Sequence, residues 1–236
     1  MIEVAVVLAA GSGSRLRPLT DEVPKPLIEV GGRTLIARTL DAIAAAGIGE
    51  VTVVVGHLAA QIEDHLADTA EPAVSFVQQA EPLGSGHAVA LARQSVRDGP
   101  FLLVWGDVVT DSSDYSTVAT AWSPGLDAVI GVIEVEDVSE GGAVVFDDDG
   151  AVTAVVEKPR GEPPSRWNSA GIMVLGPAIW DFVEALQPSA RGELEFTDAL
   201  AAMIDAGAKV VAVPLQGPWF DVGTPDRLEE ARLAWG

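Results

Sequence analysis

VAVVLAAGSGSRLRPLTDEVPKPLIEV, residues 4–30, contains an apolar run, a loop of small residues and three cationic side chains, in that order. The run at residues 4–8 has the length and composition of a buried strand. Small residues at positions 9–14 allow the backbone to approach a ligand and to direct its N–H groups toward it. Arg15 and Lys25, the second of which lies between two prolines, add positive charge. The stretch therefore predicts an anion-binding site at the carboxyl end of a strand.

Two better-known glycine loops do not fit this stretch. A Rossmann fingerprint needs a third glycine three residues after Gly13, where this chain has Leu16. A P-loop ends in Gly-Lys-Ser or Gly-Lys-Thr, and Lys25 comes too late for that pattern. For the glycine pair alone, an ordinary strand-to-helix turn is an equal alternative. The added cations Arg15 and Lys25 favour a phosphate site that uses another arrangement.

The composition excludes several classes of protein. A chain of 236 residues with 48% hydrophobic residues can build one α/β domain with a sizeable core. It has no cysteine, which excludes disulfides and thiolate metal sites. No apolar run is as long as a membrane span and no signal peptide precedes the first strand, so we expect a soluble, cytoplasmic protein. The net charge of −21 argues against binding a nucleic-acid polymer or an anionic membrane.

Strand and helix patterns alternate along the chain. Residues 34–46 have apolar side chains at helical spacing, whereas residues 51–55 and 74–78 have the β-branched composition of strands. This alternation predicts an α/β fold with a Rossmann-like, mostly parallel central sheet flanked by helices, in a single domain over residues 1–236. Further strands are expected at residues 101–105, 127–135 and 209–215, a hairpin at 141–159, and helices at 178–186 and 196–206.

The motifs of the first stretch identify a family. LAAGSGSRLRPLT at residues 8–20, followed by PKPL at 24–27 and VGG at 30–32, closely resembles the sugar-1-phosphate nucleotidyltransferases. The resemblance continues along nearly the whole chain. It implies an enzyme that joins a nucleoside triphosphate to a sugar 1-phosphate, which yields a nucleotide sugar and pyrophosphate. It also implies that Arg15 holds the triphosphate and the leaving pyrophosphate, and that Lys25 neutralises the α-phosphate.

The resemblance implies a nucleotide site made from two loops. In the family, the segment that corresponds to QQAEPLGSGHAV at residues 78–89 reads the base. The chemistry is suitable, because a glutamine amide offers both a donor and an acceptor to a base edge, and glycine permits backbone contact. Without the family, a polar loop with a helix cap is the simpler interpretation. The implied nucleotide-binding residues are Leu8, Ala10, Gly11, Ser12, Gly13, Gln79, Gly84 and Ser85.

Two aspartates are the candidate metal ligands. Asp107 follows the apolar run at residues 101–105, where ligands of α/β proteins bind, and oxygen ligands suit Mg²⁺. A turn or helix-capping aspartate is the common alternative. In the family, the Gly-Asp at this place binds the metal. Asp221 lies in WFDVGT at residues 219–224, which matches the family's second metal carboxylate, so the implied cofactor is Mg²⁺.

The resemblance places the acceptor site in a smaller mixed β region over residues 134–175. Gly142 matches a glycine whose backbone approaches the sugar, and Glu157-Lys158-Pro159 matches a motif that contacts the sugar and its phosphate. Without the family, Glu157 and Lys158 are an ordinary pair at a strand end. Asn168 matches an asparagine that holds sugar hydroxyls, but it is one residue out of place, so Ser169 is the alternative.

Other functions stay open at the level of sequence. The partners are a nucleoside triphosphate and a sugar 1-phosphate, with a weak preference for a pyrimidine (UTP, dTTP or CTP) over GTP. The acceptor alternatives are phosphocholine or a phosphonate. A non-catalytic nucleotide-sugar sensor is a further alternative on the same fold. We expect a monomer or a homodimer.

Overall fold

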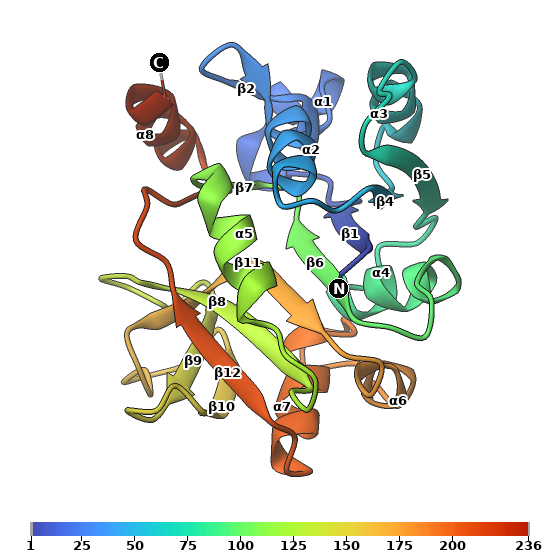
Figure 1. Cartoon of the computed structure of the whole chain (residues 1–236). Helices are drawn as coiled ribbons and strands as arrows, with labels where there is room; N and C mark the ends of the chain where they lie inside the picture. The colour runs from blue at the N-terminus through green and yellow to red at the C-terminus, as the bar shows by residue number, and fades with distance from the viewer. Residues whose placement is uncertain (1, 236) are drawn as a thin grey trace.

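The computed structural model describes residues 2–235 and contains one nine-stranded sheet with helices on both faces (Figure 1). Four parallel strands form its first half, in the spatial order β6, β1, β4, β5. These strands are β1 (Val4–Ala9), β4 (Glu50–Val55), β5 (Ala73–Gln78) and β6 (Phe101–Trp105). The mostly parallel sheet predicted from the sequence is confirmed.

The second half of the sheet is mixed. Strand β11 lies between β6 and β8 and is antiparallel to both, and β12 then pairs parallel with β8. The strands are β8 (Ala128–Glu134), β9 (Gly142–Phe146), β10 (Val152–Glu157), β11 (Trp167–Leu175) and β12 (Val210–Pro214). The predicted hairpin is β9–β10. In its turn, Asp147 Oδ1 accepts hydrogen bonds from the N–H groups of Asp149 (3.0 Å) and Ala151 (2.9 Å).

The alternation of buried side chains places a core on each face of the sheet. In β1, Val4 and Val6 face one core, and Ala5 and Val7 face the other. The first core lies under α4 (Ser85–Leu91), α6 (Ile179–Glu184) and α7 (Phe196–Asp205). The second lies under α2 (Leu35–Ala45), α3 (Ala59–Leu66) and α5 (Ser112–Ala121). A strand with two buried faces is apolar throughout, which explains the continuous run at residues 4–8.

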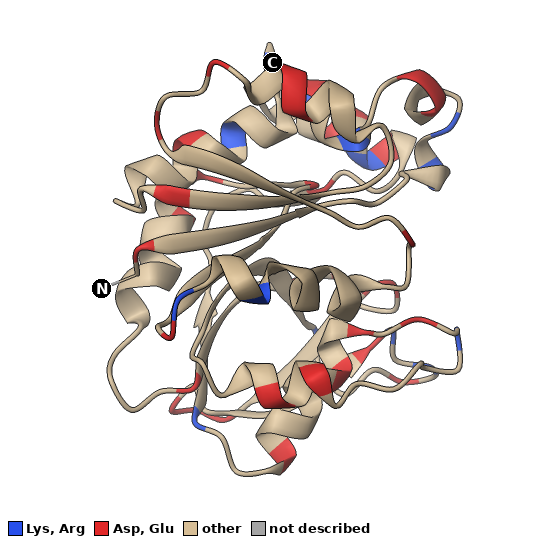
Figure 2. Cartoon of the chain, turned by 90° about the vertical axis from the view of Figure 1, so that its right-hand side faces the viewer, with Lys and Arg blue, Asp and Glu red and all other residues tan. Residues whose placement is uncertain are grey.

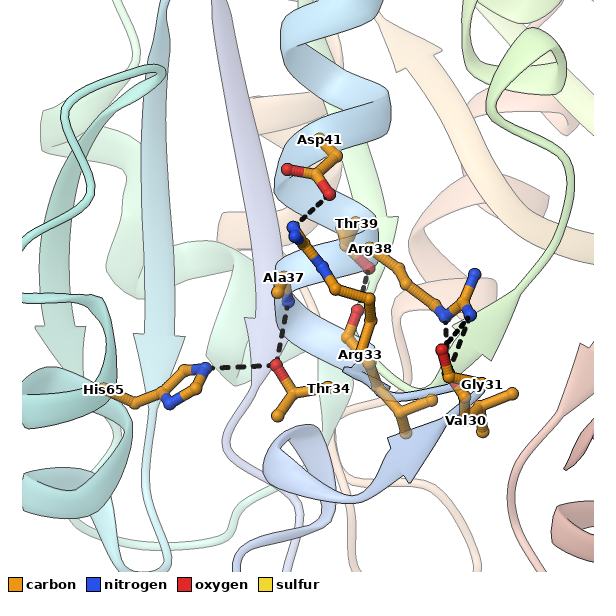
Figure 3. A network of polar contacts seen from close by, with 10 residues as sticks. Val30, Gly31, Arg33, Thr34, Ala37, Arg38, Thr39, Asp41 and His65 are labelled. Atoms are coloured by element: carbon orange, nitrogen blue, oxygen red, sulfur yellow. Dashed lines mark hydrogen bonds and ion pairs between the residues drawn. The ribbon is translucent and has the colours of Figure 1, made fainter. Parts of the chain in front are cut away.

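A polar network holds α2 against a small ribbon that follows Lys25 (Figure 3). The ribbon pairs β2 (Glu29–Val30) with β3 (Arg33–Thr34). Thr34 Oγ1 accepts the N–H of Ala37 at 3.3 Å, which caps α2, and lies 3.1 Å from His65 Nε2 on α3. Arg38 donates from Nη2 to the carbonyl of Val30 at 2.7 Å. These bonds fix the backbone of residues 30–38, which follow the candidate site residue Lys25 in the chain.

A second small ribbon was not predicted. Strand β7 (Val108–Val109) pairs antiparallel with β13 (Phe220–Asp221), so that Asp221 lies opposite Val108. The N–H of Val222 also donates to the carbonyl of Asp107 at 3.0 Å. The last helix, α8 (Pro225–Trp235), begins directly after this ribbon. Among residues 2–235, no helix is both long and apolar enough to cross a bilayer.

Candidate active site

The glycine loop and Asp107 follow neighbouring strands. β1 and β6 are parallel partners, with Leu8 opposite Trp105, and the N–H of Gly106 donates to the carbonyl of Leu8 at 2.9 Å. A side chain at position 106 would place its Cβ 2.9 Å from that carbonyl oxygen, so the close approach requires glycine. The loop that begins after Ala9 and the carboxylate of Asp107 are therefore neighbours at one edge of the sheet.

Lys25 joins the two candidate metal ligands. It begins the short 3₁₀ helix η2 (Lys25–Leu27), and only 8% of its surface is exposed. Its Nζ lies 2.6 Å from Asp107 Oδ2 and 3.7 Å from Asp221 Oδ1. The structure thus brings three residues from distant parts of the chain into one charged group. The β7–β13 ribbon makes this possible, because it holds Asp221 beside the end of β6.

Asp221 has an unusual environment for a carboxylate. Burial and the neighbouring charge of Asp107 raise its pKa above the ordinary value, although Lys25 and Arg15 act in the opposite direction. Its Oδ1 is buried and accepts no hydrogen bond among the described residues. A buried carboxylate oxygen without a donor is costly unless a cation or a ligand completes its environment.

The glycine loop is fixed by the backbone conformation of Gly13 and by the Thr20 hydroxyl. Gly13 has φ of +62°, a conformation that favours glycine, and its carbonyl accepts the Thr20 hydroxyl at 2.8 Å. A Cβ at Gly13 would lie 2.9 Å from Thr20 Cγ2 and 3.3 Å from Lys25 Cβ. The loop therefore packs directly against the base of Lys25. Leu8, Ala10, Gly11 and Ser12 precede this contact and line neither of the cavities described below.

Arg15 lies at the rim of the site and is half exposed. Its Nη1 is 3.9 Å from Glu140 Oε2. A Cβ at Gly223 would lie 3.0 Å from Arg15 Nη2 and 3.1 Å from Asp221 Oδ1. Glycine at position 223 therefore leaves room for the guanidinium beside the carboxylate. Arg15 lines an open hollow of about 720 Å³, which the sequence analysis did not anticipate and which also contains Glu140 and Arg227.

A smaller cavity of about 140 Å³ adjoins the charged group. Asp107 and Asp221 lie in its wall, and three of the four predicted acceptor residues do as well: Gly142, Glu157 and Asn168. Aromatic side chains contribute the apolar part of the wall: Trp105, Phe196 and Trp219. A small cavity with aromatic faces and a few polar groups next to two carboxylates is suited to a compact, hydroxylated ligand.

Asn168 and Ser169 both line this cavity. Asn168 is 8% exposed, and its Nδ2 donates to the carbonyl of Ser169 at 2.9 Å. Its Oδ1 accepts no hydrogen bond among the described residues. A Cβ at Gly141 would overlap this oxygen, so the backbone of Gly141 lies against it. The Asn168 oxygen is therefore buried in the wall of the cavity without a donor, whereas Ser169 Oγ accepts the N–H of Gly171 at 3.5 Å.

Lys158 is the predicted acceptor residue that does not line the cavity. Its φ is +42°, which is strained for a residue with a side chain, and its N–H donates to the carbonyl of Gly141 at 2.8 Å. The predicted base-reading residues lie elsewhere as well. Gln79 Nε2 donates to the carbonyl of Gly84 at 3.0 Å and lies 3.1 Å from His87 Nδ1.

Thr197 and Arg191 are site residues that the sequence analysis missed. Thr197 lines the smaller cavity and donates its hydroxyl to Glu157 Oε2 at 2.7 Å. Arg191 Nη2 lies 3.6 Å from Glu157 Oε1. The acidic residues Glu193 and Glu195 lie just before Phe196, but no spacing rule connects this pattern to Glu157.

Acidic side chains are prominent both in the site and over the rest of the surface, and the charged residues that line the smaller cavity are all acidic: Asp107, Glu140, Glu157 and Asp221. Acidic residues are spread over helices and loops in both layers, and basic ones are few (Figure 2). Among residues 2–235, no group of three or more histidine, cysteine, aspartate or glutamate side chains is placed to hold a metal ion. A cation at Asp107 and Asp221 would therefore need further oxygen ligands from a substrate or water.

Comparison with known proteins identifies the family of this chain. The family model described as nucleotidyl transferase matches residues 4–235. The chain is 38% identical over 234 residues to a glucose-1-phosphate thymidylyltransferase of Streptomyces antibioticus, which covers 97% of this chain and 65% of that protein. It is 34% identical over 230 residues to the UTP–glucose-1-phosphate uridylyltransferase AglF of Haloferax volcanii, with 96% and 94% covered. The chain thus spans about two thirds of the first relative and nearly all of the second.

A solved structure has the same fold. It is described as a UDP-glucose pyrophosphorylase complexed with UDP-glucose, and it superposes with a TM-score of 0.92 at 23% identity, over 100% of this chain and 98% of that one. At this identity the likeness establishes the fold alone. The resemblance predicted from the motifs is confirmed by the family model and by relatives that match at least 96% of this chain. The chain belongs to the nucleotidyl transferase family.

Proposed function

We propose that this chain transfers a nucleotidyl group from a pyrimidine nucleoside triphosphate, dTTP or UTP, to a hexose 1-phosphate. The observation that carries the proposal is the meeting of Lys25, Asp107 and Asp221 beside a small cavity with polar and aromatic walls. The printed activities of the two relatives support glucose 1-phosphate as the first acceptor to test. The region 134–175 supplies Gly142, Glu157 and Asn168, which supports its assignment to the acceptor side.

The reaction needs positioning and charge stabilisation more than bond chemistry. An oxygen of the sugar phosphate attacks the α-phosphorus, and the bond from that phosphorus to the bridging oxygen of pyrophosphate breaks. Two anions must approach each other, so the protein must offset their repulsion. Lys25 is held close to this point by Asp107, and it neutralises the α-phosphate. Arg15 is half exposed and lines the open hollow, so its guanidinium can contact the pyrophosphate as it leaves.

Asp107 and Asp221 fit a magnesium ion as ligands. Mg²⁺ usually takes one or two carboxylates and completes its shell with phosphate oxygens and water. The buried Oδ1 of Asp221 accepts no hydrogen bond and has Lys25 Nζ at 3.7 Å, and burial and Asp107 raise the pKa of this carboxyl; these are features expected of a pair that binds a divalent cation. When bound, the ion would supply electrophilic charge on the phosphate oxygens. Lys25 would remain next to Asp107, and its ammonium group would contact the α-phosphate.

The acceptor residues have separate tasks in this proposal. Glu157, fixed by Thr197, accepts hydrogen bonds from sugar hydroxyls. Asn168 Oδ1 accepts another, which would satisfy a buried oxygen that otherwise lacks a donor. Lys158 follows Glu157 directly, and its strained backbone conformation supports a role in holding the sugar phosphate.

The test is product formation from dTTP or UTP and glucose 1-phosphate with Mg²⁺, followed by mass spectrometry. We expect an NDP-glucose whose amount equals the pyrophosphate released. EDTA should stop the reaction, and excess Mg²⁺ should restore it. Nucleotide binding without any NDP-hexose, across hexose 1-phosphates, would contradict the proposal and favour a sensor protein.

A further inference from the structure

The loop at residues 78–89, which the family resemblance assigns to reading the base, contacts a second segment far along the chain. We use the term linking segment for residues 191–197, which comprise the end of the connection from α6 to α7 and the first two residues of α7. The N–H of Leu194 donates to the carbonyl of Leu83 at 2.8 Å, and the N–H of Gly86 donates to the carbonyl of Leu194 at 2.7 Å. The loop at residues 83–86 and the linking segment are thus joined through their backbones on both sides of Leu194.

Ser85 completes this connection with its side chain. Its Oγ accepts the N–H of Phe196 at 3.0 Å, across 111 residues of sequence. Phe196 is the first residue of α7, and the preceding Glu195 provides no side-chain cap for that helix. A first-turn N–H has no partner within its own helix, so a hydroxyl there stabilises the helix start. Ser85 therefore caps α7 from the base-reading loop.

Residues at the two ends of the linking segment hold the carboxylate of Glu157. Thr197, next to the capped residue, donates to Glu157 Oε2 at 2.7 Å. Arg191, at the other end of the segment, lies 3.6 Å from Glu157 Oε1 and 2.8 Å from Glu195 Oε1. Glu195 is only 6% exposed, so Arg191 is anchored on a buried carboxylate. Both oxygens of Glu157 are therefore held by groups of one short segment.

The backbones of the loop at residues 83–86 and of the linking segment pack closely against each other. Gly84 has φ of +109°, and a Cβ there would lie 2.5 Å from the Leu194 carbonyl oxygen. A Cβ at Gly86 would lie 2.9 Å from the same oxygen. These glycines let two backbones approach closely, so a shift of the loop must move Leu194 as well.

We propose that the linking segment couples the nucleotide pocket to the acceptor pocket, and that Ser85 is a positioning residue for Glu157 rather than a nucleotide contact. This inference rests on the proposed function. A nucleotide that binds the loop at residues 79–86 stabilises the observed positions of Leu194 and Phe196, and with them the hydrogen bond by which Thr197 holds Glu157 for the acceptor. The coupling is reciprocal, so each substrate increases the affinity for the other by the same factor.

The two roles of Ser85 predict different consequences of losing its hydroxyl. As a positioning residue, Ser85→Ala leaves the affinity for nucleotide alone unchanged and reduces the coupling between the substrates. As a nucleotide contact, the same change weakens nucleotide binding equally with and without acceptor. Since one hydrogen bond at a partly buried site is involved, we expect the coupling factor to fall about three- to tenfold.

The experiment is calorimetric binding of glucose 1-phosphate with Mg²⁺, in the presence and absence of the α,β-methylene analogue of UTP or dTTP. The analogue cannot release pyrophosphate, so both ligands stay bound without reaction. The variants are Ser85→Ala, Ser85→Thr, which keeps the hydroxyl, and Thr197→Val, which removes the bond to Glu157. Ser116→Ala, in α5 and outside both cavities, is the matched control.

We expect Ser85→Thr and Ser116→Ala to keep the wild-type coupling factor. We expect Ser85→Ala and Thr197→Val to reduce it, and the double variant to reduce it no further than either single one. If Ser85→Ala does not fold, Thr197→Val alone decides the result. Unchanged coupling in folded Ser85→Ala or Thr197→Val, or a wild type without coupling, would overturn the inference. Failure of the analogue to bind the wild type would instead contradict the proposed function.

Discussion

Lys25 and Asp107, which are 82 residues apart in the sequence, form a partly buried ion pair with 2.6 Å between Nζ and Oδ2. The pair follows from two local features. The prolines on either side of Lys25 fix its backbone, and the contact between Gly106 and Leu8 fixes the start of the Asp107 loop. Charge that is placed before substrate binds costs no reorganisation during the reaction.

The first prediction concerns this pair. Lys25→Ala and Asp107→Ala should each reduce kcat by about 10² or more, since each removes an electrostatic contact to the transition state. The measurement is the initial rate of pyrophosphate release at saturating substrates. Lys209→Ala is the matched lysine control, because that side chain is exposed and lies outside both cavities, and its rate should stay near the wild type. Near-normal turnover in both site variants would refute the assignment.

The second prediction uses the pKa of Asp221. The folded protein raises this pKa above its ordinary value of 3.8 through burial and the charge of Asp107. Within the window between these two values the folded state binds more protons than the unfolded state, so stability falls as pH rises through the folded pKa. Asp221→Asn removes this loss. Without metal or nucleotide, the variant should therefore gain stability relative to the wild type between pH 4 and pH 7.

Urea unfolding across that pH range measures the effect. Asp148→Asn, in the exposed turn between β9 and β10, is the control, and its difference from the wild type should not follow the same curve. A difference between Asp221→Asn and the wild type that is constant or shrinks toward pH 7 would contradict the raised pKa. The stabilised variant should nevertheless be inactive, which separates stability from function at this position.

The third prediction decides between Asn168 and Ser169. The unpartnered Oδ1 of Asn168 should accept a sugar hydroxyl, so Asn168→Ala should raise KM for the acceptor about five- to tenfold and leave KM for the nucleotide unchanged. Ser169→Ala should change acceptor KM less than about twofold, because the Ser169 oxygen already accepts the N–H of Gly171. The reverse ranking of the two variants would identify Ser169 as the contact.

The fourth prediction concerns Gly84 as a packing position. Gly84→Ala would place a methyl group against the Leu194 carbonyl at a backbone conformation that disfavours side chains. Gly125 has a similar φ of +100° with open space around it, so Gly125→Ala reports the cost of the backbone conformation alone. The free energy of unfolding should fall by at least about 1 kcal/mol more for Gly84→Ala than for Gly125→Ala. Equal losses would show that the Leu194 contact is adaptable.

Local patterns predicted the sheet well, since buried parallel strands and amphipathic helices carry strong periodic signals. Residues 101–105 form β6 as expected, and the hairpin expected at residues 141–159 forms from β9 and β10. The β7–β13 ribbon had no such signal, because strands of two residues show no periodicity and their partners are far apart in sequence. The motifs predicted Asp107 and Asp221 as metal ligands, but only the fold shows that Lys25 lies within ion-pair distance of both.

For the same reason, the sequence did not predict the contacts of Ser85 and Thr197. A serine at the start of a helix is an ordinary capping candidate for that helix, and nothing in the sequence indicates that Ser85 caps α7 instead. The bond from Thr197 to Glu157 joins a helix start to a strand end that lies 40 residues earlier. Both contacts arise from packing between elements, for which a single sequence carries no spacing rule.

The most direct test of the whole account is pyrophosphate release with Mg²⁺ across five nucleoside triphosphates and a series of acceptors. The series should contain glucose, mannose, N-acetylglucosamine and heptose 1-phosphates, with phosphocholine as the non-sugar acceptor. The account predicts one strongly preferred pair, with dTTP or UTP as donor and a hexose 1-phosphate as acceptor. Release with phosphocholine alone, or no release by folded protein that binds nucleotide, would contradict it.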